Sequence, residues 1–144
     1  MTGHLGASKT LTAWIALIGG SLGLHRFYLH GWRDPWGWAF PLPTLLGLYG
    51  VQRMRWLGQD DRLAWILIPL LGVTLSIAML AAIVAGLTPD ERWKLQHPGA
   101  PARASGWMAV IAVLLAVSMG AGVLIATIAF TAQRYFEAQT AAEP

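Results

Sequence analysis

The sequence predicts an all-α integral membrane protein with four transmembrane helices, and three observations lead to this class. Hydrophobic residues make up 56% of the 144 residues. Charged residues make up only 12%, about half the share usual in a soluble domain. Four stretches contain no Asp, Glu, Lys or Arg: residues 10–25, 35–52, 63–89 and 104–133. This composition excludes a disordered tail, a coiled coil and an ordinary soluble enzyme domain.

The first two apolar stretches are short for a bilayer, which needs about 20 apolar residues in a helix. Residues 27–29 extend the first stretch if the Arg26 side chain reaches to the interface. Pro41 and Pro43 remove backbone donors, so we expect the second helix to be kinked or to begin irregularly near residues 40–44. A re-entrant hairpin formed by the first two segments is the alternative.

The third and fourth stretches are long enough to cross a bilayer as continuous helices. Between them, Thr88 precedes Pro89 and Glu91 in a pattern typical of a helix N-terminus, with Thr88 as the N-cap. We therefore expect a short helix over residues 89–96, a flexible linker over 98–105, and a C-terminal tail that frays beyond Glu137. The expected division is a hairpin unit, residues 1–61, and a second helix pair, residues 62–144, with a polar loop at 88–106.

Small residues recur at a spacing of four, which lets transmembrane helices approach closely. The residues expected to pack helices are Gly19 and Gly23, then Ala78, Ala82 and Gly86, then Ala112, Ala116 and Gly120. They favour either a compact bundle or docking on a larger membrane protein. Tryptophans gather at the expected junctions, as in an interfacial belt, among them Trp32 and Trp36.

The sequence offers little catalytic chemistry. None of the expected spans contains Asp or Glu, which weighs against a proton antiporter. The chain has no cysteine and four histidines, none of them in the two long spans, so we expect no metal, haem or other cofactor. Because no acid–histidine pair accompanies the serines of the spans, we expect no enzyme. Ten scattered Lys and Arg indicate contacts with headgroups, so bound lipids are expected and nucleic acid is not.

Residues 19–31 form the most informative stretch, with Gly20, Gly23 and then His25-Arg26-Phe27-Tyr28-Leu29. Over residues 9–61 the chain resembles the TM2 domain family, although His30 precedes the expected glycine. Gln52-Arg53 stands where the family tends to carry an Asp. The resemblance implies a tight hairpin of two helices joined by a short polar turn, and no reaction. In that turn Arg26 can pair with lipid phosphate or with carbonyls at a helix end, and Phe27 and Tyr28 anchor it at the interface.

We therefore expect a non-catalytic accessory or assembly subunit, docked on a larger membrane complex such as a bioenergetic one. The alternatives are an oligomeric transporter or channel for ions or small solutes, and a protein that binds lipid, quinone or pigment. The expected location is a bacterial-type inner membrane, crossed several times. Four spans divide Lys and Arg five against five, with Lys9 on the side of Arg53 and Arg134, so charge indicates no orientation.

Overall fold

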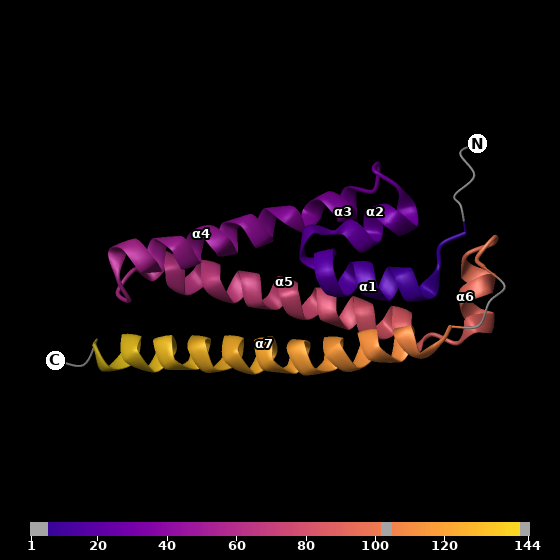
Figure 1. Ribbon diagram of the computed structural model, residues 1–144. Helices are drawn as coiled ribbons and strands as arrows, with labels where there is room; N and C mark the ends of the chain where they lie inside the picture. The colour runs from indigo at the N-terminus through magenta and orange to yellow at the C-terminus, as the bar shows by residue number, and fades with distance from the viewer. Residues whose placement is uncertain (1–5, 102–104, 142–144) are drawn as a thin grey trace.

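The computed structural model describes residues 6–101 and 105–141, and within them all regular structure is helical. The two longest helices are α5 (Arg62–Leu87) and α7 (Trp107–Thr140), and both are long and apolar enough to cross a membrane. The others are α1 (Lys9–Gly19), the 3-10 turn η1 (Gly20–Leu22), α2 (Leu24–His30), α3 (Pro35–Ala39), α4 (Pro41–Leu57) and α6 (Asp90–Gln96). Figure 1 shows an elongated bundle in which α1–α5 and α7 run along the long axis and α6 lies at one end.

The first apolar stretch is not one helix, which corrects the expectation. Helix α1 has 11 residues, a rise of about 16 Å, or half of a hydrocarbon core. Gly23 then adopts φ 74°, a left-handed conformation that ends the turn η1. As a result α2 runs back beside α1, as Figure 1 shows. The backbone N–H of Ser8 donates to the Tyr28 hydroxyl at 3.1 Å, which brings the start of α1 next to α2.

The second apolar stretch begins irregularly, as expected. Helix α3 ends at Ala39, Phe40 interrupts the helix, and α4 follows at Pro41. Pro41 occupies the first turn of α4, where a missing N–H leaves no intrahelical bond unmade. Together α3 and α4 run along the bundle in one direction (Figure 1).

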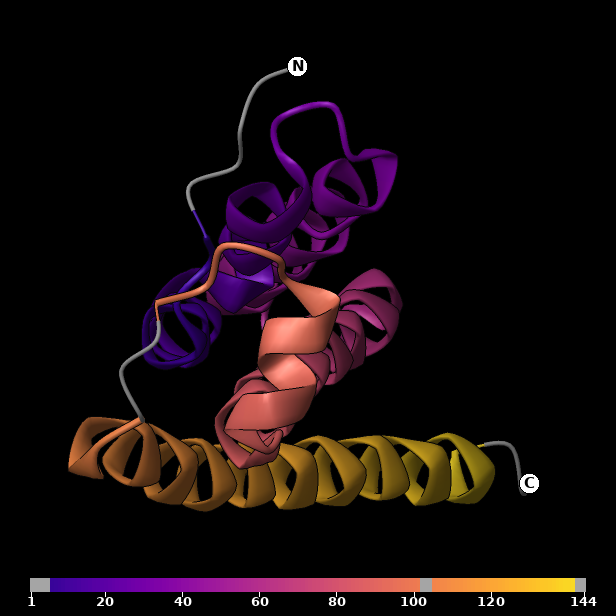
Figure 2. The same ribbon diagram turned by 90° about the vertical axis from the view of Figure 1, so that its right-hand side faces the viewer.

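Helix α5 lies at the centre of the bundle, with α4, α1 and α7 packed around it. Figure 2 shows α7 beneath the other helices, crossing α5 obliquely. The expected tight hairpin between the first and second helices takes another form. The contact with α4 is made by η1, where the Thr44 hydroxyl donates to the Ser21 carbonyl at 2.5 Å. The helices joined by the short polar turn are α2 and α3.

The link between the two long helices contains the expected short helix, α6, but with a different N-cap. The Thr88 hydroxyl donates back to the Val84 carbonyl at 2.6 Å and so caps the end of α5. Pro89 occupies the N-cap position of α6 without a side-chain cap. Of the linker expected over 98–105, residues 102–104 lie outside the described residues.

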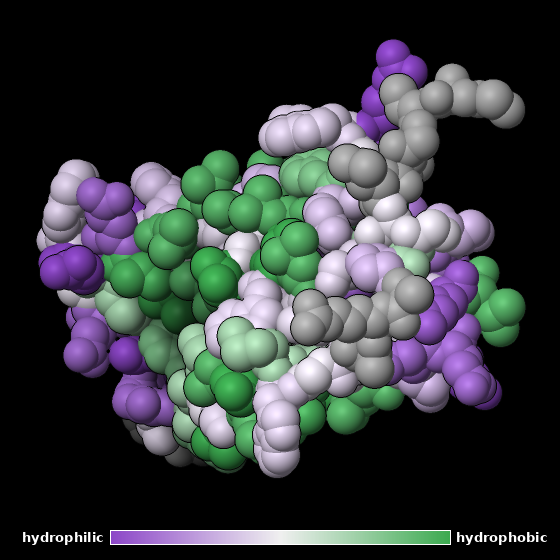
Figure 3. Space-filling model, turned by 45° about the vertical axis from the view of Figure 1, so that its right-hand side comes forward, coloured by the Kyte–Doolittle hydropathy of each residue, from purple (hydrophilic) through white to green (hydrophobic). Residues whose placement is uncertain are grey.

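Charged side chains lie mostly at the two ends of the bundle. Lys9 lies at the α6 end, where its Nζ is 2.9 Å from Asp90 Oδ1, and not beside Arg53 and Arg134. The expectation that Lys9 lies on the same side as Arg53 and Arg134 is therefore wrong. Figure 3 shows hydrophilic side chains at the ends of the visible face and hydrophobic ones between them. At the far end α7 stays helical to Thr140, beyond the point where fraying was expected.

Candidate functional site

A groove of about 610 Å³ lies between α2, the C-terminal half of α5 and α6. Its wall on α5 is apolar, formed by residues such as Ile77, Leu80 and Val84. Five polar side chains with nitrogen atoms also line it: His25, Arg26, His30, Gln96 and His97. An apolar cavity with a few convergent polar groups is the usual form of a small-molecule site.

His25 is the most unusual of these residues. Its exposed fraction is 6%, and its Nδ1 atom has no hydrogen-bond partner among the described residues. The ring also contacts Phe40 edge-on, with centroids 5.4 Å apart. A buried polar atom without a partner costs about 1–3 kcal/mol. Because Nδ1 itself has almost no accessible surface, a ligand in the groove would contact other atoms of the His25 ring.

Arg26 follows His25 and extends toward the turn between α2 and α3. Its Nε donates to Asp34 Oδ2 at 2.7 Å, and this bond lowers the pKa of the Asp34 carboxyl below its usual value. Asp34 also accepts from the Trp36 backbone N–H and so caps α3. Among the described residues no partner uses the two Nη nitrogens of Arg26, so the guanidinium keeps four of its five N–H donors.

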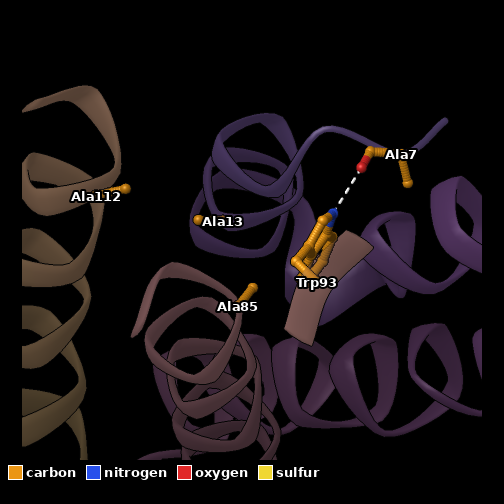
Figure 4. Close-up of a cluster of buried hydrophobic side chains, with 5 residues drawn as sticks. All are labelled: Ala7, Ala13, Ala85, Trp93 and Ala112. Atoms are coloured by element: carbon orange, nitrogen blue, oxygen red, sulfur yellow. Dashed lines mark hydrogen bonds between the residues drawn. The ribbon is translucent and has the colours of Figure 1, made fainter. Parts of the chain in front are cut away.

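Helix α6 forms the other wall of the groove. The rings of Trp93 and His97 stack, with centroids 4.2 Å apart and planes 23° from parallel. The indole Nε1 of Trp93 donates to the Ala7 carbonyl at 2.7 Å, which ties α6 to the segment before α1. Figure 4 shows this bond beside the buried alanines of α1, α5 and α7, which are Ala13, Ala85 and Ala112.

A polar cluster on α6 strengthens this attachment. The Lys9 ammonium donates to Asp90 Oδ1 at 2.9 Å and to the Thr88 carbonyl at 2.7 Å. The same carboxylate accepts from the Ser105 hydroxyl at 2.8 Å and from its backbone N–H at 3.2 Å. These donors lower the pKa of Asp90 from its ordinary 3.8 to about 2. The cluster therefore joins α1, α6 and the start of the α7 segment.

Acid should loosen α6. Because the pKa of Asp90 is lower in the folded protein, its contribution to stability is complete above about pH 4 and is lost as the pH falls toward 2. We expect the hydrogen-exchange protection of residues 93–97, corrected for intrinsic rates, to fall between pH 4 and pH 2. Asp90→Asn should show low protection at both values. Equal pH dependence in the two proteins would contradict a role for this carboxylate.

The motif turn carries an aromatic cluster on the outside of the bundle. Phe27 stacks on Trp32 with centroids 5.2 Å apart and meets Trp38 edge-on at the same distance. Trp38 Nε1 donates to the Trp32 carbonyl at 2.9 Å. Trp32 and Trp36 are exposed by 71% and 67%. Exposed indoles at one end of an apolar bundle match the headgroup region of a bilayer.

The small residues singled out in the sequence contact other parts of this chain or are buried. Ala78, Ala82, Ala112 and Ala116 are fully buried. A methyl group on Gly86 would lie 2.2 Å from the Val113 side chain, and one on Gly120 would lie 2.9 Å from Met79 Cβ. Gly19 abuts the Leu24 side chain, and Gly23 abuts the Gly37 carbonyl. These stripes therefore serve packing within the chain.

Sequence reasoning missed one residue of the groove and several contacts elsewhere in the bundle. From the sequence alone His97 has no assigned role, but this residue lines the groove and stacks on Trp93. Asp34 and Lys9 were not assigned partners, because their partners Arg26 and Asp90 lie 8 and 81 positions away. Arg134 was placed only as a flanking charge. It is buried, with Nη1 bonded to Glu137 and Nη2 to Gln59, between the rings of Trp65 and Phe130.

Comparisons with known proteins give the site no precedent. No protein-family model matches the sequence, and neither the curated proteins nor the solved structures contain a significant match. In the part of the chain that the structure describes, His, Asp and Glu side chains do not gather into a group that could hold a metal ion.

Proposed function

We propose that this chain is a multi-pass protein of a bacterial-type inner membrane, with three crossings and one half-membrane hairpin. Helix α5, helix α7 and the pair α3–α4 make the crossings, and α1 and α2 enter and leave on one side. The fold-back at Gly23 and the short length of α1 support this arrangement. It replaces the four spans expected from the sequence, and it puts Lys9 and Arg134 on opposite sides of the membrane.

The function we propose is non-catalytic binding of a membrane amphiphile in the groove. The observation that carries this proposal is a groove in which the apolar wall of α5 meets five nitrogen-bearing side chains: His25, Arg26, His30, Gln96 and His97. An amphiphile would place its polar part near the nitrogen-bearing side chains and its chain along α5. The α5 side chains of the groove, among them Ile77, Leu80 and Val84, are about half exposed, so lipid would reach them without crossing the bundle. Lipids, quinones and pigments all fall within this class.

Purification in a mild detergent, followed by lipid extraction and an absorption spectrum, tests the proposal. We expect one class of amphiphile to co-purify at close to one molecule per chain. The variant Leu80→Trp fills the groove and should lose that molecule, whereas Leu114→Trp, on the exposed face of α7, should retain it. Purified protein with only the bulk lipid mixture in both variants would contradict a specific site.

The accessory-subunit interpretation is a second candidate, supported by one feature of α7. Ser118, Gly122 and Ala126 recur every four residues on this helix, and all three are exposed. A methyl group added at Gly122 would meet nothing within 4 Å. Such a stripe suits close packing against a partner helix. Blue-native electrophoresis of native membranes should then show a larger complex, which Gly122→Leu disrupts; a free monomer in the wild type would contradict it.

The transporter or channel interpretation receives no support from the polar residues of the long helices. The hydroxyls of these residues donate to carbonyls four positions earlier in the same helix, at 2.7–2.9 Å: Thr74, Ser76, Ser118, Thr127 and Thr131. Hydroxyls used in this way do not form a continuous polar path. A lack of ion or solute flux in liposomes would agree with this assignment.

A further inference from the structure

We propose that the groove selects an anionic phospholipid, with its phosphate at Arg26 and one acyl chain along α5. This inference rests on the proposed amphiphile binding and names the ligand class. Three features of the groove carry it: the charge of its rim, the position of His25 relative to that rim, and the apolar wall that faces both.

The charge of the groove favours an anion. Arg26 lines the groove, and no lining residue is an Asp or Glu. Asp34 binds Arg26 through Nε only and does not line the groove itself, so the Nη edge remains available for the ligand. Arginine can bind two phosphate oxygens through such an edge. His30 adds a further imidazole at the same rim.

The depth of His25 matches the structure of a glycerolipid. His25 lies five residues before His30 on α2, which corresponds to about 7 Å along the helix axis. The Arg26 guanidinium reaches the level of His30, because Arg26 Nε lies 2.7 Å and His30 Nδ1 lies 3.9 Å from the same Asp34 Oδ2 atom. A phosphate bound at this guanidinium would therefore place the glycerol ester groups near the level of His25. The part of the His25 ring that lines the groove would offer an N–H donor to an ester carbonyl when the neutral imidazole is protonated at Nε2.

The apolar wall distinguishes a phospholipid from other ligands that could bind the same polar side chains. Below His25 the groove continues along Ile77, Leu80 and Ala81 of α5, which can contact only an apolar chain. Free phosphate would leave this wall without a ligand. An uncharged quinone would fill the wall but would leave the guanidinium edge of Arg26 without an anion.

Native mass spectrometry of the full chain from nanodiscs tests the headgroup preference. The nanodiscs contain equal amounts of phosphatidylglycerol and phosphatidylcholine with identical acyl chains. We expect at least a tenfold preference for phosphatidylglycerol as the bound lipid. Arg26→Gln should reduce this preference about tenfold or more, the effect of losing about 1.4 kcal/mol. Arg33→Gln, the same charge change at an exposed residue outside the groove, should leave it unchanged.

Asp34→Asn distinguishes a ligand role of Arg26 from a structural one. This variant breaks the ion pair but keeps the guanidinium, so the preference should persist or increase. If Arg26 only holds the turn, both variants should lose lipid equally, and the inference would be wrong. Addition of 10-fold excess inorganic phosphate should displace no lipid; displacement would assign the rim to free phosphate.

The outcomes separate this inference from the proposed function. If no amphiphile binds wild-type protein, the proposed function fails. If a lipid binds equally with either headgroup, or a quinone binds instead, amphiphile binding stands and the anionic selection is overturned.

Discussion

Replacing Gly23 with alanine should destabilise the protein more than the same replacement at Gly19 or Gly20, where the closest atoms belong to side chains. Gly23 has φ 74°, and its added Cβ would lie 2.2 Å from the Gly37 carbonyl oxygen. Backbone strain and the clash with α3 add up to an expected cost of about 3–5 kcal/mol. Because α2 must shift to relieve the clash, the groove should also lose its amphiphile. Reversible unfolding in mixed micelles and lipid extraction measure the two effects.

Gly58→Ala is the control for Gly23→Ala. Gly58 also has a positive φ, 89°, but a Cβ there would meet nothing within 4 Å. Its cost should be limited to backbone strain, about 1–3 kcal/mol, with the amphiphile retained. If Gly23→Ala is no more destabilising than Gly58→Ala and retains its amphiphile, the fold-back does not form the groove as described.

The second large effect is expected at Gly47, where α4 packs against α5. A Cβ at Gly47 would lie 2.3 Å from Leu71 Cβ and 2.9 Å from both the Cα and the backbone N of Leu71. Backbone atoms of a neighbouring helix cannot move aside singly, so α4 as a whole must move outward. Gly47→Ala should therefore lower the free energy of unfolding by about 1–3 kcal/mol, even though alanine is the better helix former.

Gly122→Ala makes the same change on the exposed face of α7, with nothing within 4 Å of the new Cβ. It should be neutral or stabilise the helix by up to about 1 kcal/mol. The test compares the changes in the free energy of unfolding that the two variants cause, measured in mixed micelles, and it asks whether their signs differ. Equal effects at both positions would mean that α4 and α5 do not pack at this distance.

Much of the fold follows from composition and spacing. The two long helices could be predicted from their uninterrupted apolar stretches alone. In lipid, a single segment can satisfy its own backbone hydrogen bonds only as a helix. The interruption near Phe40 followed from Pro41 and Pro43. The short helix α6 followed from its flanking prolines, although Thr88 caps the preceding helix instead.

The fold-back of the first stretch did not follow, because glycines four apart predict close helix packing as readily as a turn. Gly19 and Gly23 suited a packing stripe in a continuous helix, and only the conformation of Gly23 separates the two cases. The groove could not be predicted from the sequence for the same reason. His25 and His97 lie 72 positions apart in the sequence, and they line one groove only when α2 returns to the α6 end.

Cysteine accessibility tests the half-membrane hairpin most directly, because the chain has no cysteine of its own. Single cysteines at Ser8, Arg33 and Gln139 would be labelled with an impermeant maleimide in sealed vesicles of one orientation. A hairpin that returns at Gly23 predicts that positions 8 and 33 are labelled from the same side and position 139 from the opposite side. Labelling of positions 8 and 139 from one side, and of position 33 from the other, would restore four crossings and contradict the groove.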